Sequence, residues 1–200
     1  MGSAFVKQLT RAGHTVVVAA RNIEKAEAVA AANPGATARA LANAAEQAEV
    51  IVLATGYADA VVALKSVGNL LGKIVIDITN PLTADYMGLS IGHTTSAAEE
   101  IAKAVPEAKV VKAFNTVFAQ VLAEGADFGN GHVVPVYFAG DDAAAKSTVS
   151  NLIESIGFAP VDAGPLKNAR YLEPVAGLNI YFGYGAGKGT AIAPFWLDRA

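Results

Sequence analysis

The first residues with a recognisable chemical use stand at the start of an amphipathic segment. Gly2 and Ser3 precede a helical spacing over residues 3–12, in which Phe5 and Leu9 share one face. Amides at a helix N-terminus bind phosphate groups. In the dinucleotide fingerprint Gly-x-Gly-x-x-Gly, Gly2 takes the place of the third glycine. The pattern predicts a pyrophosphate site at Gly2 and Ser3, and the alternative is an N-terminal glycine without a ligand.

An arginine stands where such a site usually carries its specificity residue. Residues 15–20 have the composition of a buried strand, and Arg21 and Asn22 follow directly. About 20 residues after the loop, an acid usually binds the ribose hydroxyls of NAD, whereas an arginine binds the extra phosphate of NADP. No acid comes before Glu24, and a guanidinium binds phosphate through paired hydrogen bonds. Arg21 therefore favours NADP, with a solvated loop residue as the alternative.

The elements that must position these residues alternate between short apolar strands and helices. We expect strands at residues 15–20, 50–54, 74–78 and 109–114, and helices at residues 3–12, 23–32, 40–48, 58–71 and 96–105. Later we expect a strand at 133–139, a helix opened by Asp141 or Asp142, a strand at 158–162, and a helix from Asn168. This rhythm predicts an α/β fold: a Rossmann-like, doubly wound parallel sheet with helices on both faces, followed by a C-terminal helix and tail.

The chain length suits one domain. We expect residues 1–200 to form a single NADP-binding domain, with residues 1–116 as the dinucleotide-binding core and residues 117–200 as C-terminal strands, helices and tail. Because the chain opens on the helix of a βαβ unit, we expect the N-terminal strand and the start of the glycine-rich loop to be missing. That strand is central in the order 3-2-1-4-5-6, so its loss should divide the sheet and weaken folding or NADP binding.

The composition excludes several classes of function. The sequence has no cysteine, so disulfides, thiolate zinc sites and cysteine nucleophiles are excluded, and its three histidines are dispersed without ligand spacing, so we expect no metal. A net charge of −3 argues against nucleic-acid binding. The apolar runs are too short for a membrane span, and no secretory signal is recognised. We therefore expect a cytoplasmic protein.

Six segments give the chain a specific resemblance over its whole length. They are "MGSAFVKQLTRAGHTVVVAARN", "EVIVLATG", "GKIVIDITNPL", "AKVVKAFNT", "VYFAGDD" and "VDAGPLKNARYLEP". Their order resembles that of the NADPH-dependent reductases of the deazaflavin coenzyme and their relatives, including predicted dinucleotide-binding oxidoreductases. The resemblance implies that Met1 lies inside the glycine-rich loop, and it implies a homodimer.

The resemblance also assigns cofactor contacts residue by residue. It implies that Gly2 and Ser3 touch the pyrophosphate and that Arg21 with Asn22 holds the 2'-phosphate. At the end of the third expected strand, the implied lining of the cofactor cleft is Ala54, Thr55 and Gly56. The family often has Val-Pro where this chain has Thr55-Gly56, so the contacts there can differ.

Polar residues end the next two expected strands. Asn80 and Pro81 come after residues 74–78, and Asn115 follows residues 109–114, at the sheet edge where ligands bind in open parallel sheets. An asparagine can donate to and accept from a carboxamide or a flavin-like ring edge, and Pro81 stiffens the strand exit. Turn or cap roles are the alternative for both asparagines. No catalytic acid, base or nucleophile is assigned, because hydride transfer mainly needs the two rings to be positioned and water to be excluded.

These observations predict an NADP(H)-dependent oxidoreductase that transfers a hydride between nicotinamide and a deazaflavin or flavin-like acceptor, a small molecule. A non-catalytic NADP-binding, redox-sensing module is the alternative. A third possibility is a dehydrogenase of imino or hydroxy acids, for which Lys112 is the lysine nearest the cleft. Asp77, an acid in an apolar strand, is expected to be paired or at the sheet edge. The aromatic tail, residues 181–196 with Trp196 at its end, would cover the nicotinamide or contact a second subunit.

Overall fold

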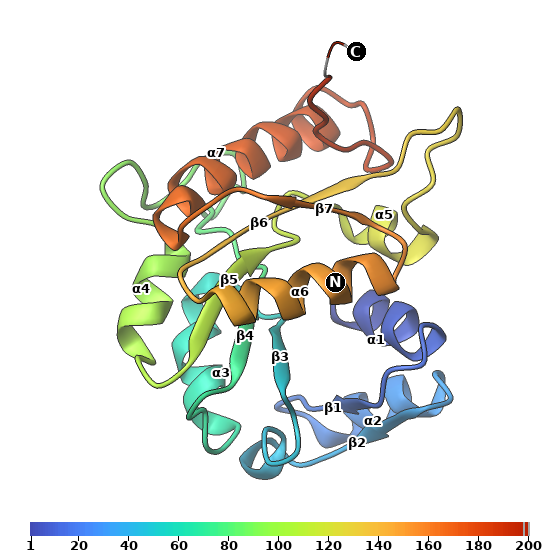
Figure 1. Ribbon diagram of the computed structural model, residues 1–200, viewed down its shortest axis with the longest axis vertical. Coiled ribbons are helices and arrows are strands. Elements are labelled where there is room, and N and C mark those ends of the chain that lie inside the picture. The colour runs from blue at the N-terminus through green and yellow to red at the C-terminus, as the bar shows by residue number, and fades with distance from the viewer. Residues whose placement is uncertain (198, 200) are drawn as a thin grey trace.

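Strands and helices alternate along the chain in the computed structural model, which describes residues 1–197 and 199 (Figure 1). The strands are β1 (Val16–Val18), β2 (Ala36–Ala38), β3 (Val50–Leu53), β4 (Ile74–Asp77), β5 (Lys109–Ala113), β6 (Pro135–Gly140) and β7 (Ala159–Asp162). The α-helices are α1 (Gly2–Arg11), α2 (Ile23–Ala31), α3 (Ala60–Ser66), α4 (Ala97–Ala104), α5 (Ala119–Glu124), α6 (Ala143–Ser155) and α7 (Ala169–Ile180). Short 3-10 turns occupy Leu41–Asn43, Tyr57–Asp59 and Leu166–Asn168, and a π-helical turn, η4, continues α7 over Tyr181–Gly185.

The strands form two separate sheets. β1 pairs with β2 in one, and the other has the order β3-β4-β5-β6-β7. All pairs are parallel except β5 with β6, so β6 and β7 run against β3, β4 and β5. A sheet divided between β1 and β3 is what the sequence led us to expect. The reversal at β6 was not predicted, because periodicity gives strand positions but not directions.

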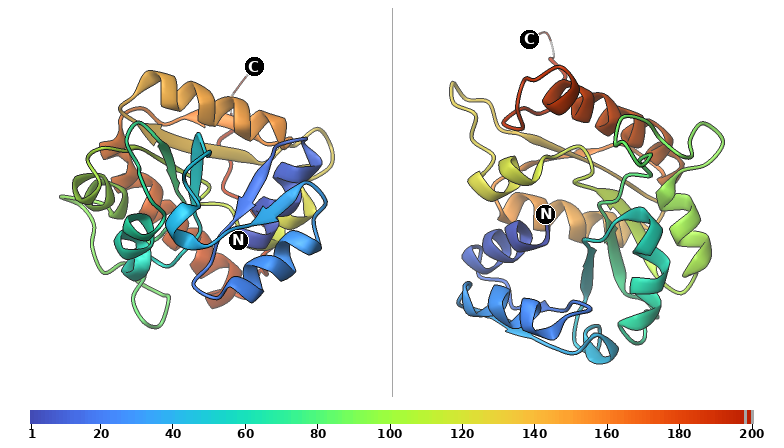
Figure 2. Two further views of the ribbon diagram at one scale, coloured as in Figure 1. Left: turned by 90° about the horizontal axis from the view of Figure 1, so that it is seen from below. Right: turned by 180° about the vertical axis from the view of Figure 1, so that it is seen from behind.

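Helices cover both faces of the five-stranded sheet, which confirms the predicted fold class. Ile74 and Ile76 of β4 point to a core shared with α1, α5 and α6, whereas Val75 between them points to a core shared with α3 and α4. This alternation is the period-two rule for strands buried on both faces. Figure 1 shows α6 in front of the sheet, and the view from behind in Figure 2 shows α3 and α4 on the opposite side.

Local signals explain where the helices begin. Ser96 Oγ accepts from the amide of Glu99 at 3.2 Å, and Asp142 Oδ1 accepts from the amide of Ala145 at 2.8 Å, so α4 and α6 start at the predicted caps. The expected helix at 40–48 is only a 3-10 turn, and β2 was not expected, because a three-residue strand is too short to show a period. None of the helices within residues 1–197 is both long and apolar enough to cross a membrane.

Candidate functional site

A cavity of about 550 Å³ lies where β4 and β5 end, beside α7. Its walls come from the ends of β4 and β5, the loop after β4, the first residue of the chain, and the C-terminal part of α7 with η4. The lining residues are Met1, Ile78, Asn80, Leu82, Asp85, Tyr86, Met87, Phe114, Asn115, Thr116, Val117, Phe118, Ala119, Ala176, Asn179, Ile180 and Tyr184. Open α/β sheets bind ligands at this edge, and the mixture of apolar walls with a few polar groups is typical of such sites.

Two residues in this lining adopt backbone conformations that disfavour their side chains. Phe114, directly after β5, has φ +59 and is fully buried, and Tyr86 in the opposite loop has φ +62. A bulky residue in the left-handed region is an outlier, and such strain concentrates at binding sites. Phe114 is held there by edge-on packing against Phe5 and Phe158, at ring distances of 4.9 and 6.3 Å. The strained turn ends β5 at the point where Asn115 begins.

Asn80 and Asn115 form an amide pair across the ends of β4 and β5. Asn80 Nδ2 donates to the backbone carbonyl of Asn115 at 3.0 Å, and Asn115 Nδ2 donates to Asn80 Oδ1 at 3.0 Å. Asn115 Nδ2 also donates to the carbonyl of Leu172 in α7 at 2.9 Å. The pair therefore connects two strands and a helix, rather than capping a local turn as the alternative had it.

A close helix approach forms the aromatic side of the cavity. At Gly183 in η4, an added Cβ would lie 2.7 Å from Cζ of Phe118, so any larger residue would push η4 away from that ring. The next residue, Tyr184, packs edge-on against Phe118 with ring centroids 5.8 Å apart. π-helical turns within α-helices are frequent at functional sites. Here the turn brings Tyr184 to the cavity wall.

A fully buried ion cluster lies next to the amide pair. Lys112 Nζ lies 2.8 Å from Asp77 Oδ2, 2.8 Å from Glu173 Oε1, and 2.6 Å from the carbonyl of Thr79. Nζ donates hydrogen bonds to Asp77 and to the Thr79 carbonyl, and its contact with Glu173 is an ion pair. Glu173 also accepts from two amides at the start of α4, those of Ala97 at 3.0 Å and Ala98 at 3.2 Å. Asp77 is paired as expected, and Lys112 fixes α7 to the sheet instead of facing a substrate.

The N-terminus of α1 lies beside the end of β3, as the predicted pyrophosphate site requires. A Cβ added to Gly2 would lie 3.7 Å from Cβ of Ala54, which places these two predicted residues side by side. Met1 precedes the helix and lines the cavity, so the helix start and the cavity are continuous. Ser3, Thr55 and Gly56 are exposed near this edge.

Arg21 follows β1 and reaches toward the same edge. Its side chain is 84% exposed, and Nη2 lies 3.3 Å from Oδ2 of Asp59, which follows β3. Asn22 Oδ1 accepts from the amide of Lys25 at 3.1 Å and so caps α2. Because this ion pair is exposed, Arg21 can leave Asp59 and bind an anion such as a phosphate. Asn22 Oδ1 already caps α2, so the predicted phosphate contact of Asn22 would compete with that cap.

One carboxylate stands among the residues that line the cavity. Asp85 Oδ1 accepts from the Thr83 hydroxyl at 2.5 Å, and this bond, with one from the amide of Met87, holds the pKa of Asp85 below its usual range. The lining includes no histidine, lysine or arginine, and residues 1–197 hold no group of His, Asp and Glu side chains suited to a metal. The site offers orientation and exclusion of water rather than acid and base groups.

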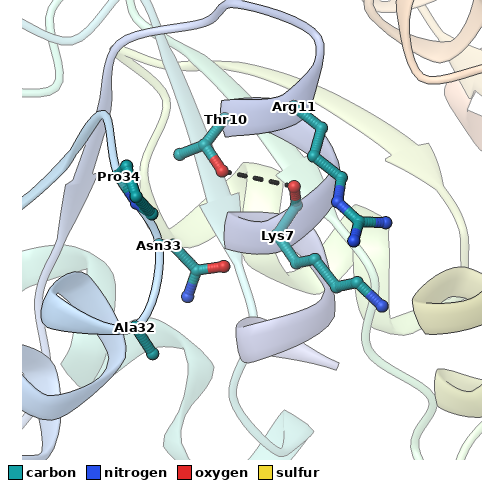
Figure 3. A pocket seen from close by; sticks show the side chains of 6 residues that line it. All are labelled: Lys7, Thr10, Arg11, Ala32, Asn33 and Pro34. Carbon is teal, nitrogen blue, oxygen red and sulfur yellow. Dashed lines mark hydrogen bonds between the residues drawn. The ribbon is translucent and has the colours of Figure 1, made fainter.

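A second cavity, of about 430 Å³, lies between α1 and the segment after α2 (Figure 3). It is lined by Lys7, Thr10, Arg11, Ala32, Asn33 and Pro34. Several of its polar groups are used within the fold, since the Thr10 hydroxyl donates to the carbonyls of Val6 and Lys7, and Lys7 Nζ donates to the carbonyl of Ala123. It lies toward the C-terminal half of α1, away from Gly2, and so does not extend the first site.

Several lining residues were missed at the level of sequence. Asn80 and Asn115 line the cavity as predicted, while Pro81 is buried next to it and accepts from the Ser90 amide at 2.7 Å. Tyr86 was missed because it comes from a loop, whereas Tyr184 belongs to the aromatic tail, residues 181–196, that was expected to cover the nicotinamide or contact a second subunit. The glycines that flank Tyr184 were the available signal. Trp196 is 61% exposed and packs edge-on against Tyr137 at 5.0 Å, outside the cavity lining.

Comparisons with known proteins show what this chain is similar to. Residues 1–81 match the family model described as "NADP oxidoreductase coenzyme F420-dependent". The metalloreductases STEAP3 of Rattus norvegicus and STEAP2 of Homo sapiens are 39% identical over 106 residues and 32% identical over 104 residues. These stretches cover 53% and 52% of this chain, and the chain spans about a fifth of the length of either curated relative, 20% and 19%.

Solved structures extend the similarity to the whole chain. A protein of Arthrobacter sp. FB24, provisionally described as an F420-dependent NADP-reductase, superposes with a TM-score of 0.85 at 32% identity, covering 99% of this chain and 95% of that one. A hypothetical protein of Sinorhizobium meliloti has a TM-score of 0.76 at 33% identity, over 84% and 82% of the two chains. The resemblance drawn from the sequence segments is confirmed: the chain belongs to the family of coenzyme F420-dependent NADP oxidoreductases.

Proposed function

We propose that this protein binds NADP(H) and transfers a hydride between its nicotinamide and a deazaflavin or flavin-like acceptor. The observation that carries the proposal is the continuity of the start of α1 with the cavity at the ends of β4 and β5, through Met1. A dinucleotide that crosses this edge would hold its pyrophosphate at Gly2 and Ser3 and extend its nicotinamide toward Asn80 and Asn115.

The residues present fit such a cofactor. The first amides of α1 lack partners within the helix and lie at its positive end. Arg21 presents an exposed guanidinium to the same edge for the 2'-phosphate. Asn115 Oδ1 is buried without a hydrogen-bond partner among the described residues, so a polar ligand group is suited to it. The single carboxylate of the lining, Asp85, belongs to the loop on the far wall.

Hydride chemistry would be supplied by the nicotinamide and the acceptor ring themselves. The chain's own residues would hold the two rings face to face, which is the main requirement of the step. Asn80 and Asn115 fix the position of a ring edge, and Phe114, Phe118 and Ile180 exclude water. The apolar walls, and a lining whose single carboxylate is Asp85 in the loop after β4, agree with direct transfer of a hydride.

Turnover with a panel of acceptors tests the proposal. The protein is mixed with NADPH and a deazaflavin, FMN or a quinone, and the loss of the reduced nicotinamide absorbance is followed. Oxidation with the deazaflavin or FMN supports the proposal. Tight NADPH binding without turnover for any acceptor would instead indicate the redox-sensing module.

We further propose that two copies of the chain associate through the outer face of α7. Tyr171, Leu178 and Tyr181 are 71%, 55% and 52% exposed, a concentration of large apolar side chains typical of interfaces. A single mass near twice 20.4 kDa in light scattering is the expected result, and a monomer at micromolar concentration contradicts it.

A further inference from the structure

Two consecutive residues after β5 bury side-chain oxygens that have no hydrogen-bond partner. Asn115 and Thr116 are 7% and 2% exposed, and both line the cavity. Oδ1 of Asn115 and Oγ1 of Thr116 make no hydrogen bond with any of the described residues. Leaving a buried polar group unpaired costs free energy, so such groups are usually paired in the working state of a protein. Their shared place in the cavity points to a ligand.

The orientation of the Asn115 amide follows from its partners. One end of this side chain contacts the carbonyl of Leu172, which can only accept, so that end is the donor Nδ2. The same nitrogen donates to Asn80 Oδ1, and Asn80 is itself fixed because its Nδ2 donates to the backbone carbonyl of Asn115. The unpaired atom is therefore the acceptor oxygen Oδ1. The ligand atom that pairs with Oδ1 must therefore be a hydrogen-bond donor.

The two free groups together describe a ligand chemistry. Asn115 Oδ1 needs an N–H or O–H, whereas the Thr116 hydroxyl can donate to a carbonyl or accept from an N–H. An amide or imide carries an N–H beside a carbonyl, and the apolar remainder of the cavity suits a planar ring. A quinone offers only carbonyl oxygens and would leave Oδ1 unpaired.

We propose that Asn115 and Thr116 bind the amide or imide edge of a ring ligand and so select such ligands over rings that only accept hydrogen bonds. The inference rests on the proposed function for the identity of the ring. Two sources share this chemistry: the carboxamide of nicotinamide, and the imide of a flavin-type acceptor. Binding measurements distinguish them.

Thr116→Val is the informative variant on the protein side, because valine keeps the shape and removes the hydroxyl. The backbone carbonyl of Thr116 still accepts from Asn179 Nδ2, at 3.1 Å. Thr79→Val is the matched control: its Oγ1 is also buried and unpaired, but Thr79 is not among the lining residues. Both variants should keep or raise the melting temperature, since a methyl replaces an unpaired hydroxyl. Only Thr116→Val should weaken ring binding, by roughly 2- to 10-fold, and Thr116→Ser should restore it.

The ligand side identifies the source of the amide. Dissociation constants are measured for FMN against N3-methyl FMN, and for NADPH against its 3-acetylpyridine analogue, which has no amide N–H. If the imide of the acceptor is bound, N3-methylation weakens binding and the acetylpyridine analogue matches NADPH; if the carboxamide is bound, the reverse holds. Either result supports the proposal.

The proposal is overturned if neither analogue loses affinity, or if Thr116→Val and Thr79→Val behave alike. These experiments measure dissociation constants and not turnover. The analogues and the two variants can therefore be compared even if the protein does not transfer a hydride. A protein that binds FMN and NADPH without oxidising NADPH would contradict the proposed function, while the analogue series would still decide the role of Asn115 and Thr116.

Discussion

Lys112 of β5 and Glu173 of α7 form a fully buried ion pair with Nζ and Oε1 2.8 Å apart. The pair joins the helix that forms one wall of the cavity to the central strand whose end also lines the cavity. With Asp77 as the second acid, two carboxylates share one ammonium, and the remaining negative charge is offset by the amides at the start of α4 and by the amide of Thr79. The cavity geometry therefore depends on a cluster that does not touch its ligand.

Lys112→Met should destabilise the fold strongly. The substitution leaves two buried carboxylates without their cation, and removal of one partner from a buried ion pair costs about 3–5 kcal/mol. Lys103→Met, which removes an exposed partner of Glu100, should change stability by less than about 1 kcal/mol. Urea unfolding at neutral pH measures the change in the free energy of unfolding for both variants. Equal, small effects would show that the cluster does not stabilise α7.

Arg21→Ala should weaken NADPH binding by roughly 10- to 100-fold, because a charge-assisted hydrogen bond to phosphate is worth about 1.5–3 kcal/mol. NADH has no 2'-phosphate, so its affinity should stay within about twofold, since no such bond is lost. Arg11→Ala is the control, since Arg11 lies at the far end of α1. Fluorescence titration measures the dissociation constants of NADPH and NADH for each variant. Equal losses for NADPH and NADH would contradict the assignment.

Gly183→Ala should weaken acceptor binding while leaving NADPH affinity unchanged. The new Cβ would meet the Phe118 ring at 2.7 Å, so η4 and Tyr184 must move away from the cavity. Gly177→Ala in α7 is the matched control, because the nearest atom there, on Leu89, lies 3.9 Å from the new Cβ. The KM for the acceptor and the Kd for NADPH separate the two effects. A Gly183→Ala protein with an unchanged KM would exclude Tyr184 from the acceptor site.

The Glu99–Arg170 pair should make stability fall in acid. Arg170 donates to both carboxylate oxygens of Glu99, at 2.9 and 2.6 Å, and this hydrogen bonding holds the pKa of Glu99 below its usual range. A depressed folded pKa gives stability that is complete above the unfolded value, about 4.3, and that is lost as the pH falls through the lower folded pKa.

Urea unfolding of wild type and Arg170→Met between neutral pH and pH 3 checks the pair. The stability difference between the two proteins should be largest at neutral pH and should shrink as Glu99 is protonated. A difference that stays constant with pH would mean that Arg170 stabilises α7 through packing and not through charge.

The sequence predicted the parts of the site that stand at the ends of strands and helices. Gly2, Arg21, Asn80 and Asn115 were placed correctly at strand or helix ends, because periodicity and turn residues define those ends. Their side-chain contacts could not be predicted from the sequence. Asn115 forms its hydrogen bonds with Asn80 and Leu172 only when β4 and β5 pair and α7 packs against the sheet. The reversed direction of β6 was hidden for the same reason.

Lys112 shows most clearly what could not be predicted from the sequence. The sequence named it only as the lysine that a dehydrogenase of imino or hydroxy acids would need, and nothing local distinguished that role from a buried ion pair. The decisive partner is Glu173, 61 positions later by residue number, which only the tertiary fold brings to Nζ. Tyr184 was expected only as part of the aromatic tail, although Gly183 and Gly185 on either side of it indicated an unusually close approach.

Hydride transfer itself is tested most directly by an isotope. NADPH carrying deuterium at C4 of the nicotinamide is mixed with the protein and a deazaflavin, whose reduced carbon keeps the transferred hydrogen, and the product mass is measured. Direct transfer predicts that one face of the labelled nicotinamide delivers its deuterium to the reduced deazaflavin. Oxidation of NADPH with no deuterium in the product from either the pro-R or the pro-S labelled form, or no oxidation with bound NADPH, would contradict direct hydride transfer.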